Sequence, residues 1–137
     1  MKLTFTHANP TVPGWKWPNF QPVEFLSPKD PIKTVILESE FLDRLQALRT
    51  KFGRPLVLNS GYRSPQYNSS VSNTGLHGAH TTGRAVDIKC IDSQTRFQLI
   101  KLAIELGFTG IGIAKTFIHL DDVTNNPKVP RPMSWLY

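Results

Sequence analysis

The chain has few residues that could form disulfides, cysteine-based metal sites or membrane-spanning segments. Its single cysteine, Cys90, among 137 residues excludes an internal disulfide and a cysteine-based zinc knuckle. No apolar run approaches the roughly 18 residues that a membrane-spanning helix needs. The first residues also lack an apolar stretch after Lys2, so we expect no signal peptide. Any metal ion must therefore be held by histidine and carboxylate side chains.

Acidic residues are absent from the middle of the chain, between Asp43 and Asp87. Over the whole chain, 16 lysines and arginines oppose 10 aspartates and glutamates, which gives a formal charge of +6. A basic face of this kind attracts polyanions through its long-range field. Nucleic acid, anionic cell-wall polymer and carboxylate-bearing peptides all fit, although the aromatic–basic interleaving that stacks nucleobases is missing from this stretch. Charge alone does not choose among them.

The composition is typical of one globular domain over residues 1–137, with 39% hydrophobic and 19% charged residues. Residues 1–35 are rich in proline and aromatic side chains, including Trp15, Trp17 and Phe20. We expect this segment to be an irregular arm that packs on the core through those rings.

Apolar spacing and turn residues place the remaining elements. They predict helices over about 34–52, from Ser64-Pro65 onward for a short stretch, and over about 93–106 with Asp92 as N-cap. They predict strands at about 55–59, 84–90, 110–113 and 117–121, a polar loop at 70–83 and an irregular tail. This alternation predicts an α+β fold with a small, mainly antiparallel sheet and flanking helices.

Strand parity brings three potential metal ligands together. Asp87 lies on the polar face of the strand 84–90, and His119 lies on the polar face of the strand 117–121. His80 precedes Asp87 on the polar loop, with Gly83 allowing the chain to turn back. Two histidines, one carboxylate and an open position for water are the composition of a catalytic zinc site. By themselves the three residues could also be polar groups exposed on a one-sided sheet.

Four ordered motifs carry a family resemblance. They are Ser60–Asn68 (SGYRSPQYN), Gly78–Ile88 (GAHTTGRAVDI), Gly110–Ile113 (GIGI) and Phe117–Asp121 (FIHLD). In this order and at these separations they resemble the zinc D-Ala-D-Ala carboxypeptidase family of peptidoglycan peptidases, and above all its short phage and prophage members.

The resemblance implies the fold of the D-Ala-D-Ala carboxypeptidases, which hedgehog-type signalling domains share. It implies one zinc ion per chain, bound by His80, Asp87 and His119. It also implies that Arg63 binds a carboxylate or carbonyl of the substrate, because a guanidinium donates two parallel hydrogen bonds. The alternative for Arg63 is a structural salt bridge.

The sequence departs from several branches of the family at the general base. Some branches carry an acid three residues before the last zinc histidine, where this chain has Thr116, or a histidine two residues before it, where this chain has Phe117. We expect Asp121 to serve as the catalytic base, because it shares a strand face with His119, and Asp122 is a weaker choice. Asp121 could instead orient a ligand histidine by hydrogen bonding.

The sequence thus predicts a zinc metallopeptidase of D-Ala-D-Ala carboxypeptidase type that cleaves stem peptides or cross-links of peptidoglycan. The alternative is a catalytically inactive, zinc-containing module of the same fold that binds wall peptides. We expect a monomer with no nucleic-acid or membrane partner. We also expect synthesis in the cytoplasm and action on the cell wall, after release or as a component of a virion.

Overall fold

The structure is a computed structural model that describes residues 1–137. Its principal sheet has five strands in the order β3-β4-β6-β5-β7, and a second sheet pairs β1 with β2. The strands are β1 Lys2–Thr6, β2 Thr34–Glu38, β3 Leu58–Ser60, β4 Ala85–Lys89, β5 Gly110–Ile113, β6 Phe117–Asp121 and β7 Met133–Leu136. The α-helices are α1 Ser39–Phe52, α2 Pro65–Val71 and α3 Ser93–Glu105, and short 3-10 helices are η1 Pro22–Phe25, η2 Gly75–His77 and η3 Ala79–Thr82.

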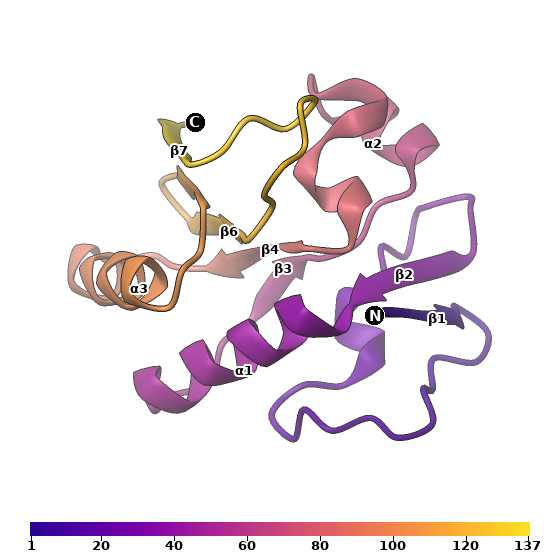
Figure 1. The fold of residues 1–137 in the computed structure, drawn as a ribbon, viewed down its shortest axis with the longest axis horizontal. Helices are drawn as coiled ribbons and strands as arrows, with labels where there is room; N and C mark the ends of the chain where they lie inside the picture. Colours follow the sequence, from indigo (N-terminus) through magenta and orange to yellow (C-terminus); the bar gives the residue numbers. More distant parts are fainter.

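Neighbouring strands of the principal sheet are antiparallel except for β5 and β7, which are parallel. In Figure 1, α1 and α3 lie on one side of this sheet, whereas α2 and the segment that leads to β7 lie on the other. The expected α+β fold with a small, mainly antiparallel sheet is confirmed.

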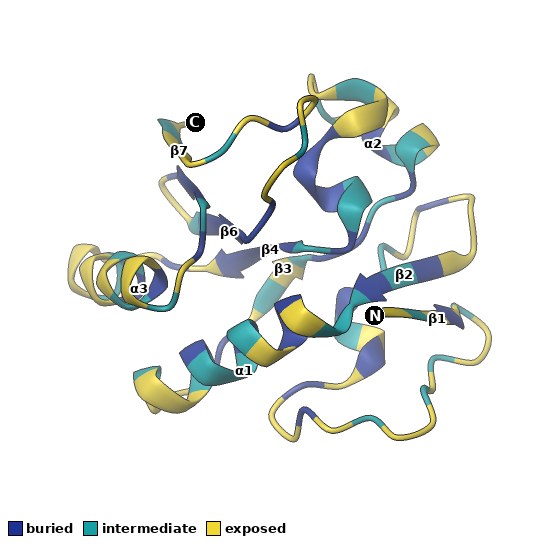
Figure 2. Ribbon diagram, viewed as in Figure 1, coloured by how far each residue is buried: buried dark blue, intermediate teal, exposed yellow.

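The hydrophobic core lies between the sheet and the helices α1 and α3. The strands contribute Val86, Ile88, Ile118 and Leu120, all fully buried because alternate side chains point to this face. Figure 2 shows the same contrast, with buried strands in the centre and exposed outer faces on α1 and α3. The opposite face of the sheet is therefore free to carry polar groups.

Local capping signals read from the sequence are confirmed where the structure shows them. The backbone N–H of Tyr67 donates to Ser64 Oγ at 3.1 Å, and that of Thr95 donates to Asp92 Oδ1 at 2.8 Å. Gly53 ends α1 in the left-handed conformation that glycine adopts without steric cost.

Two expectations for the first third of the chain are wrong. Residues 34–38 form the strand β2 instead of the first turns of the helix, which begins at Ser39. Residues 1–35 are not irregular throughout, because Lys2–Thr6 pairs antiparallel with β2. The reason is tertiary: Val35 and Leu37 alternate into the core and β1 supplies the partner strand. Three rings from this segment, Trp17, Phe20 and Phe25, also lie in the core.

Further differences lie near the polar face of the sheet. The strand expected at 55–59 is Leu58–Ser60, and the expected loop 70–83 contains the end of α2 together with η2 and η3. The tail is not wholly irregular, because Met133–Leu136 forms β7 beside β5. Pairing between segments this distant leaves no local signature in the sequence.

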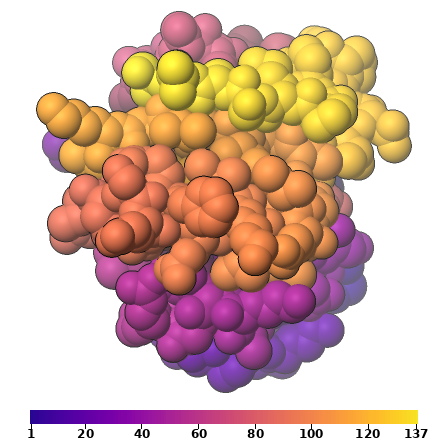
Figure 3. All heavy atoms as spheres, turned by 90° about the vertical axis from the view of Figure 1, so that its left-hand side faces the viewer, coloured from indigo at the N-terminus to yellow at the C-terminus, as the bar shows by residue number.

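The N- and C-terminal parts of the chain lie at opposite ends of the molecule, and α2 lies at the same end as the C-terminal residues (Figure 1). Figure 3 shows the N-terminal third at one end of this face, α3 across its middle and the last residues at the other end. None of the helices combines the length and apolar character required to span a membrane.

Candidate metal centre

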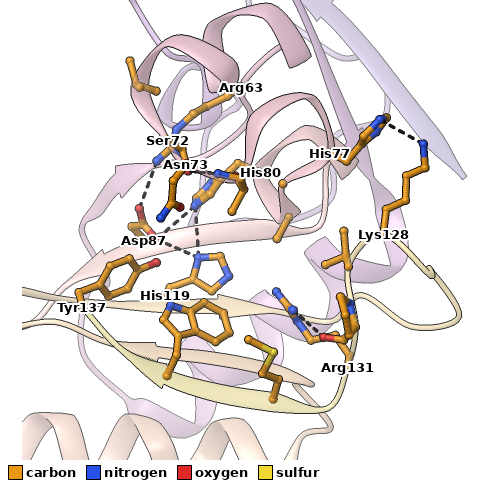
Figure 4. A pocket seen from close by; sticks show the side chains of 18 of the residues that line it. Arg63, Ser72, Asn73, His77, His80, Asp87, His119, Lys128, Arg131 and Tyr137 are labelled. Carbon is orange, nitrogen blue, oxygen red and sulfur yellow. Dashed lines mark hydrogen bonds and ion pairs between the residues drawn. The ribbon is translucent and has the colours of Figure 1, made fainter.

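Three side chains converge on the polar face of the principal sheet. His80 Nε2 lies 3.2 Å from His119 Nδ1 and 3.3 Å from Asp87 Oδ1, and His119 Nδ1 lies 3.1 Å from the same oxygen. All three residues are buried, with at most 7% of each exposed. Together they form a group that could hold a metal ion (Figure 4).

The sheet register positions two of these residues. Asp87 on β4 is the direct antiparallel partner of His119 on β6, so the expectation that they share one face is confirmed. His80 comes from η3, and the chain returns from η3 into β4 at Gly83, whose φ of +76° is left-handed. A Cβ at Gly83 would also lie 2.7 Å from the backbone oxygen of Ile36. Glycine at this turn therefore allows His80 to reach the two strand residues.

Hydrogen bonds on the far side of each imidazole select its tautomer. His80 Nδ1–H donates to the backbone oxygen of Gly61 at 2.6 Å, which leaves Nε2 as the inward nitrogen. His119 Nε2–H donates to Asp121 Oδ2 at 2.6 Å, which leaves Nδ1 as the inward nitrogen. Metal-binding histidines commonly have such partners, because these fix the ring orientation and raise the basicity of the ligand nitrogen.

The donor set and its spacing fit zinc. Tetrahedral coordination at about 2.0–2.1 Å separates neighbouring ligand atoms by about 3.3–3.4 Å. The three distances between inward atoms, 3.1 to 3.3 Å, are close to that separation. Two imidazole nitrogens and one carboxylate oxygen that line a cavity match the protein ligands of catalytic zinc sites.

Burial and charge pairing perturb the pKa values of the three clustered residues. Burial lowers the pKa of His80 below 6.5, although Asp87 opposes the effect. Burial opposes protonation of His119 as well, but hydrogen bonds to Asp121 and Asp87 outweigh it and raise the His119 pKa. Burial would raise the pKa of Asp87, yet its contacts with the two histidines hold it well below 3.8. Asp87 is therefore a carboxylate under all ordinary conditions.

Asp121 lies behind His119 and not in the cavity. Its side chain is fully buried, and Arg131 Nη2 donates to the same oxygen, Oδ2, at 2.7 Å. A Cβ at Gly110, its partner on β5, would lie 2.2 Å from that oxygen, so glycine makes room for this ion pair. Of the two roles considered for Asp121, this placement favours orienting His119 over taking a proton in the cavity.

Arg63 lies beside the cluster. Its Nη2 is 3.6 Å from Asp87 Oδ2 and donates to Ser60 Oγ at 3.2 Å, while Nη1 donates to Asn68 Oδ1 at 3.0 Å. Its side chain is only 17% exposed and lines the cavity. These contacts orient the guanidinium, as a substrate-binding role requires, and they also provide the salt bridge considered as the alternative.

The cavity in front of the cluster has a volume of about 700 Å³. One rim carries His77, whose Nε2 accepts a hydrogen bond from Lys128 Nζ at 3.2 Å (Figure 4). The opposite wall carries Trp135 and Tyr137 from the region of β7. The Trp135 ring centroid lies 5.0 Å from that of His119, so the indole packs against this histidine.

Other sequence candidates lie elsewhere. Asp122 faces away from the cavity and pairs with Arg44 and Arg84, so it cannot take the place of a base there. The sequence pattern did not place Arg131, Trp135 and Tyr137 at the cavity, because the tail offers no periodic pattern. One signal was the Gly-Ile-Gly-Ile alternation of β5, which leaves the polar face of that strand without side chains.

Comparison with known proteins agrees with this geometry. A search of curated proteins found no match to the chain. A family model described as Peptidase M15 matches residues 18–121, a range that contains the three clustered residues and Arg63. Because that match covers most of the sequence, the chain belongs to the peptidase M15 family.

Proposed function

We propose that the chain is a zinc-dependent peptidase that hydrolyses peptide bonds of peptidoglycan, in stem peptides or cross-links, in the manner of D-Ala-D-Ala carboxypeptidases and endopeptidases. Family membership implies zinc peptidase activity on peptides. The observation that carries the finer proposal is a three-ligand cluster inside a cavity whose other charged side chains are cationic.

His80, Asp87 and His119 would hold the zinc ion. When bound, zinc would polarise the carbonyl of the scissile bond and lower the pKa of a water molecule. The two histidines would serve as neutral ligands, because Gly61 and Asp121 accept the protons on their outer nitrogens. Arg63 would hold a carboxylate or carbonyl of the substrate at the edge of the cluster.

The charge of the cavity supports an acidic peptide as substrate. Arg63, Lys128 and Arg131 line it, and the only acidic residue among its lining residues is the ligand Asp87. Arg131 pairs with Asp121, and Arg63 lies 3.6 Å from Asp87, so Lys128 is the lining cation without a salt bridge. Arg63 and Lys128 lie on different sides of the cluster (Figure 4). Stem peptides of peptidoglycan carry free carboxylates that such groups would attract.

One observation favours a second candidate, a zinc-containing module that binds wall peptides without cleaving them. Apart from Asp87, no carboxylate side chain lines the cavity, so none is placed there as a general base. The two candidates share the metal site and the affinity for wall peptides. They differ in turnover alone.

The metal assignment is tested by elemental analysis of the purified protein. We expect one zinc per chain in the wild type and loss of most zinc in His80→Ala and His119→Ala, because each removes one of three ligands. His7→Ala is the matched control, since His7 lies outside the cavity. Full zinc occupancy in either ligand variant would refute the assignment.

The activity is tested by incubating purified peptidoglycan with the zinc-loaded protein and analysing the released products by mass. Release of peptides or of alanine, blocked by a chelator and restored by zinc, supports the peptidase and identifies the bond. Binding of wall peptides without any release supports the inactive module instead. We further propose that the protein acts at the cell wall, after release from the cell or as part of a virion.

A further inference from the structure

Arg63 and a bound zinc ion would be the groups that stabilise the reacting carbonyl in the site described so far. Hydrolysis of a peptide bond places negative charge on the carbonyl oxygen, and donors aimed at that oxygen lower the barrier. Both terminal nitrogens of Arg63 already contact protein oxygens, on Ser60, Asn68 and Asp87. A further donor next to the cluster would therefore be of direct use.

Tyr137 provides such a donor. Figure 4 shows its ring beside the cluster and its hydroxyl directed toward the space next to Asp87 and His119. The Trp135 side chain acts on this hydroxyl as a hydrogen-bond donor, which leaves the hydroxyl proton free for another partner. A tyrosine hydroxyl is protonated at neutral pH and can donate one hydrogen bond.

Three contacts hold Tyr137 in this position. Its backbone N–H donates to the backbone oxygen of Ile113 at 3.0 Å, which continues the pairing of β7 with β5. Its ring centroid lies 5.0 Å from that of Phe117 and 6.2 Å from that of Trp135. The side chain is thus supported from the sheet and from both neighbouring rings, although its outer edge is exposed.

The sheet also provides space for it. Asp87, His119, Gly112 and Trp135 are consecutive partners across β4, β6, β5 and β7. A Cβ at Gly112 would lie 2.7 Å from the Trp135 indole and 2.8 Å from Cε2 of the Tyr137 ring. The absence of a side chain at Gly112 therefore lets both rings lie over β5, next to the ligand His119.

We propose that Tyr137 is a catalytic residue of this peptidase, whose hydroxyl donates a hydrogen bond to the carbonyl oxygen of the scissile bond as that oxygen becomes negative. The inference rests on the proposed function. No covalent bond to Tyr137 forms, and its proton stays on the phenol oxygen throughout.

The test is Tyr137→Phe, which keeps the ring and removes only the hydroxyl. We expect kcat on wall peptides to fall about 10²–10³-fold, as for the loss of one oxyanion donor, with KM and zinc content nearly unchanged. Affinity for a phosphinate peptide, a tetrahedral mimic of the transition state, should fall while affinity for the product peptide stays constant. Tyr62→Phe is the matched control, because Tyr62 does not line the cavity and should keep wild-type turnover.

The outcomes separate this inference from the function on which it rests. Equal turnover and equal phosphinate affinity for the wild type and Tyr137→Phe would overturn the role of Tyr137 and leave the peptidase intact. A wild type that releases no product from peptidoglycan would overturn the proposed function, and the inference would fall with it. A drop in both turnover and phosphinate affinity, confined to Tyr137→Phe, supports the inference.

Discussion

At the scale of single residues, His119 is the most constrained side chain of the candidate metal centre. Its Nδ1 faces Asp87 and His80, and its Nε2 faces Asp121, which is itself held by Arg131. Each atom of the ring that can form a hydrogen bond therefore has an assigned partner. Asp121 contributes by fixing this orientation, and its own pKa is lowered by His119 and Arg131 in spite of burial.

Replacing Asp121 tests this positioning role. Asparagine keeps the shape and accepts the hydrogen bond from His119 but loses the charge that pairs with Arg131. We expect zinc affinity or activity of Asp121→Asn to fall about 10–100-fold, the usual effect of removing a partner of a metal ligand. Turnover at saturating zinc and affinity in chelator competition should be measured together, each as a function of pH.

A different result would restore Asp121 as the general base. Loss of turnover by about 10³-fold or more at full zinc occupancy, with one limb of the pH profile abolished, is the expected signature of a lost base. Asp122→Asn is the matched control for charge, because Asp122 pairs with Arg44 and Arg84 outside the cavity.

Arg63 is the second residue whose role a substitution can decide. Arg63→Lys keeps the charge but cannot donate two parallel hydrogen bonds to a carboxylate. A hydrogen bond to a charged group contributes about 1.5–3 kcal/mol, so we expect kcat/KM to fall roughly 10–150-fold while zinc content is retained. Arg54→Lys on the surface, where Arg54 bonds Gln98, is the control. Unchanged turnover in folded Arg63→Lys would leave only the salt bridge to Asp87.

At the scale of elements, β5 shapes the cavity because two of its residues are glycines without side chains. Its isoleucines face the helices, whereas Gly110 and Gly112 face the cavity side, where Asp121, Arg131, Trp135 and Tyr137 occupy the space that two side chains would fill. Because β7 runs parallel to β5 at its outer edge, the tail is held over the same face. One short strand thereby supports both the orienting ion pair and the aromatic wall.

Gly112→Ala tests this support. Gly112 does not have a positive φ, so alanine causes no backbone strain, but its Cβ would displace the Trp135 and Tyr137 rings. We expect a folded, zinc-binding protein whose kcat is lowered about tenfold or more. A displacement of about 1 Å at a catalytic group can lower the rate about 10²-fold, and we expect a smaller displacement here. Steady-state kinetics, near-ultraviolet circular dichroism and zinc analysis would measure these effects.

A double-mutant cycle identifies the route of the effect. If Gly112 acts through Tyr137, adding Gly112→Ala to Tyr137→Phe should cost much less than adding it to the wild type. Additive losses in the cycle would show that Gly112 affects turnover by another path, such as the Trp135 contact with His119.

At the scale of the whole molecule, the metal centre and the hydrophobic core occupy opposite faces of one sheet. The main core cluster contains none of the three clustered residues His80, Asp87 and His119. Protonation of the ligands, however, couples the site to pH. Protonated His119 stabilises the fold below its ordinary pKa of 6.5, and this contribution is lost as pH rises through the raised pKa.

The same proton competes with zinc, so zinc affinity should depend on pH. Zinc binding must remove one proton from His119, and we expect the apparent Kd to rise about tenfold per pH unit below the His119 pKa and to level off above it. Because Asp121 and Asp87 raise that pKa, the rise should begin at a higher pH than for an ordinary histidine. Chelator competition between about pH 5 and 8 measures it.

The Asp121→Asn variant is the control for this pH dependence. Removing the charge of Asp121 should lower the pKa of His119, so the onset of zinc loss should move to lower pH. A zinc affinity independent of pH over this range would contradict the assignment of His119 as a ligand.

The sequence by itself determined what local patterns encode. Period-2 alternation placed Asp87 and His119 on one face, and the register confirms that they are direct partners. The caps at Ser64 and Asp92 were also readable, because a cap depends on residues only three positions apart. The ordered motifs identified the family, which the family model confirms.

Only the tertiary structure decided what depends on distant segments. Lys2–Thr6 finds its partner strand more than 25 residues later, and that pairing converts the expected start of a helix into β2. The pairing of β7 with β5 brings Tyr137 to the cluster, and Arg131 reaches Asp121 from the same segment. Strand parity placed Asp121 on the same strand face as His119. The side of the imidazole that Asp121 contacts depends on the orientation of the ring, which contacts with Asp87 and His80 restrain. Such orientation is a property of packed side chains, and no spacing along the chain encodes it.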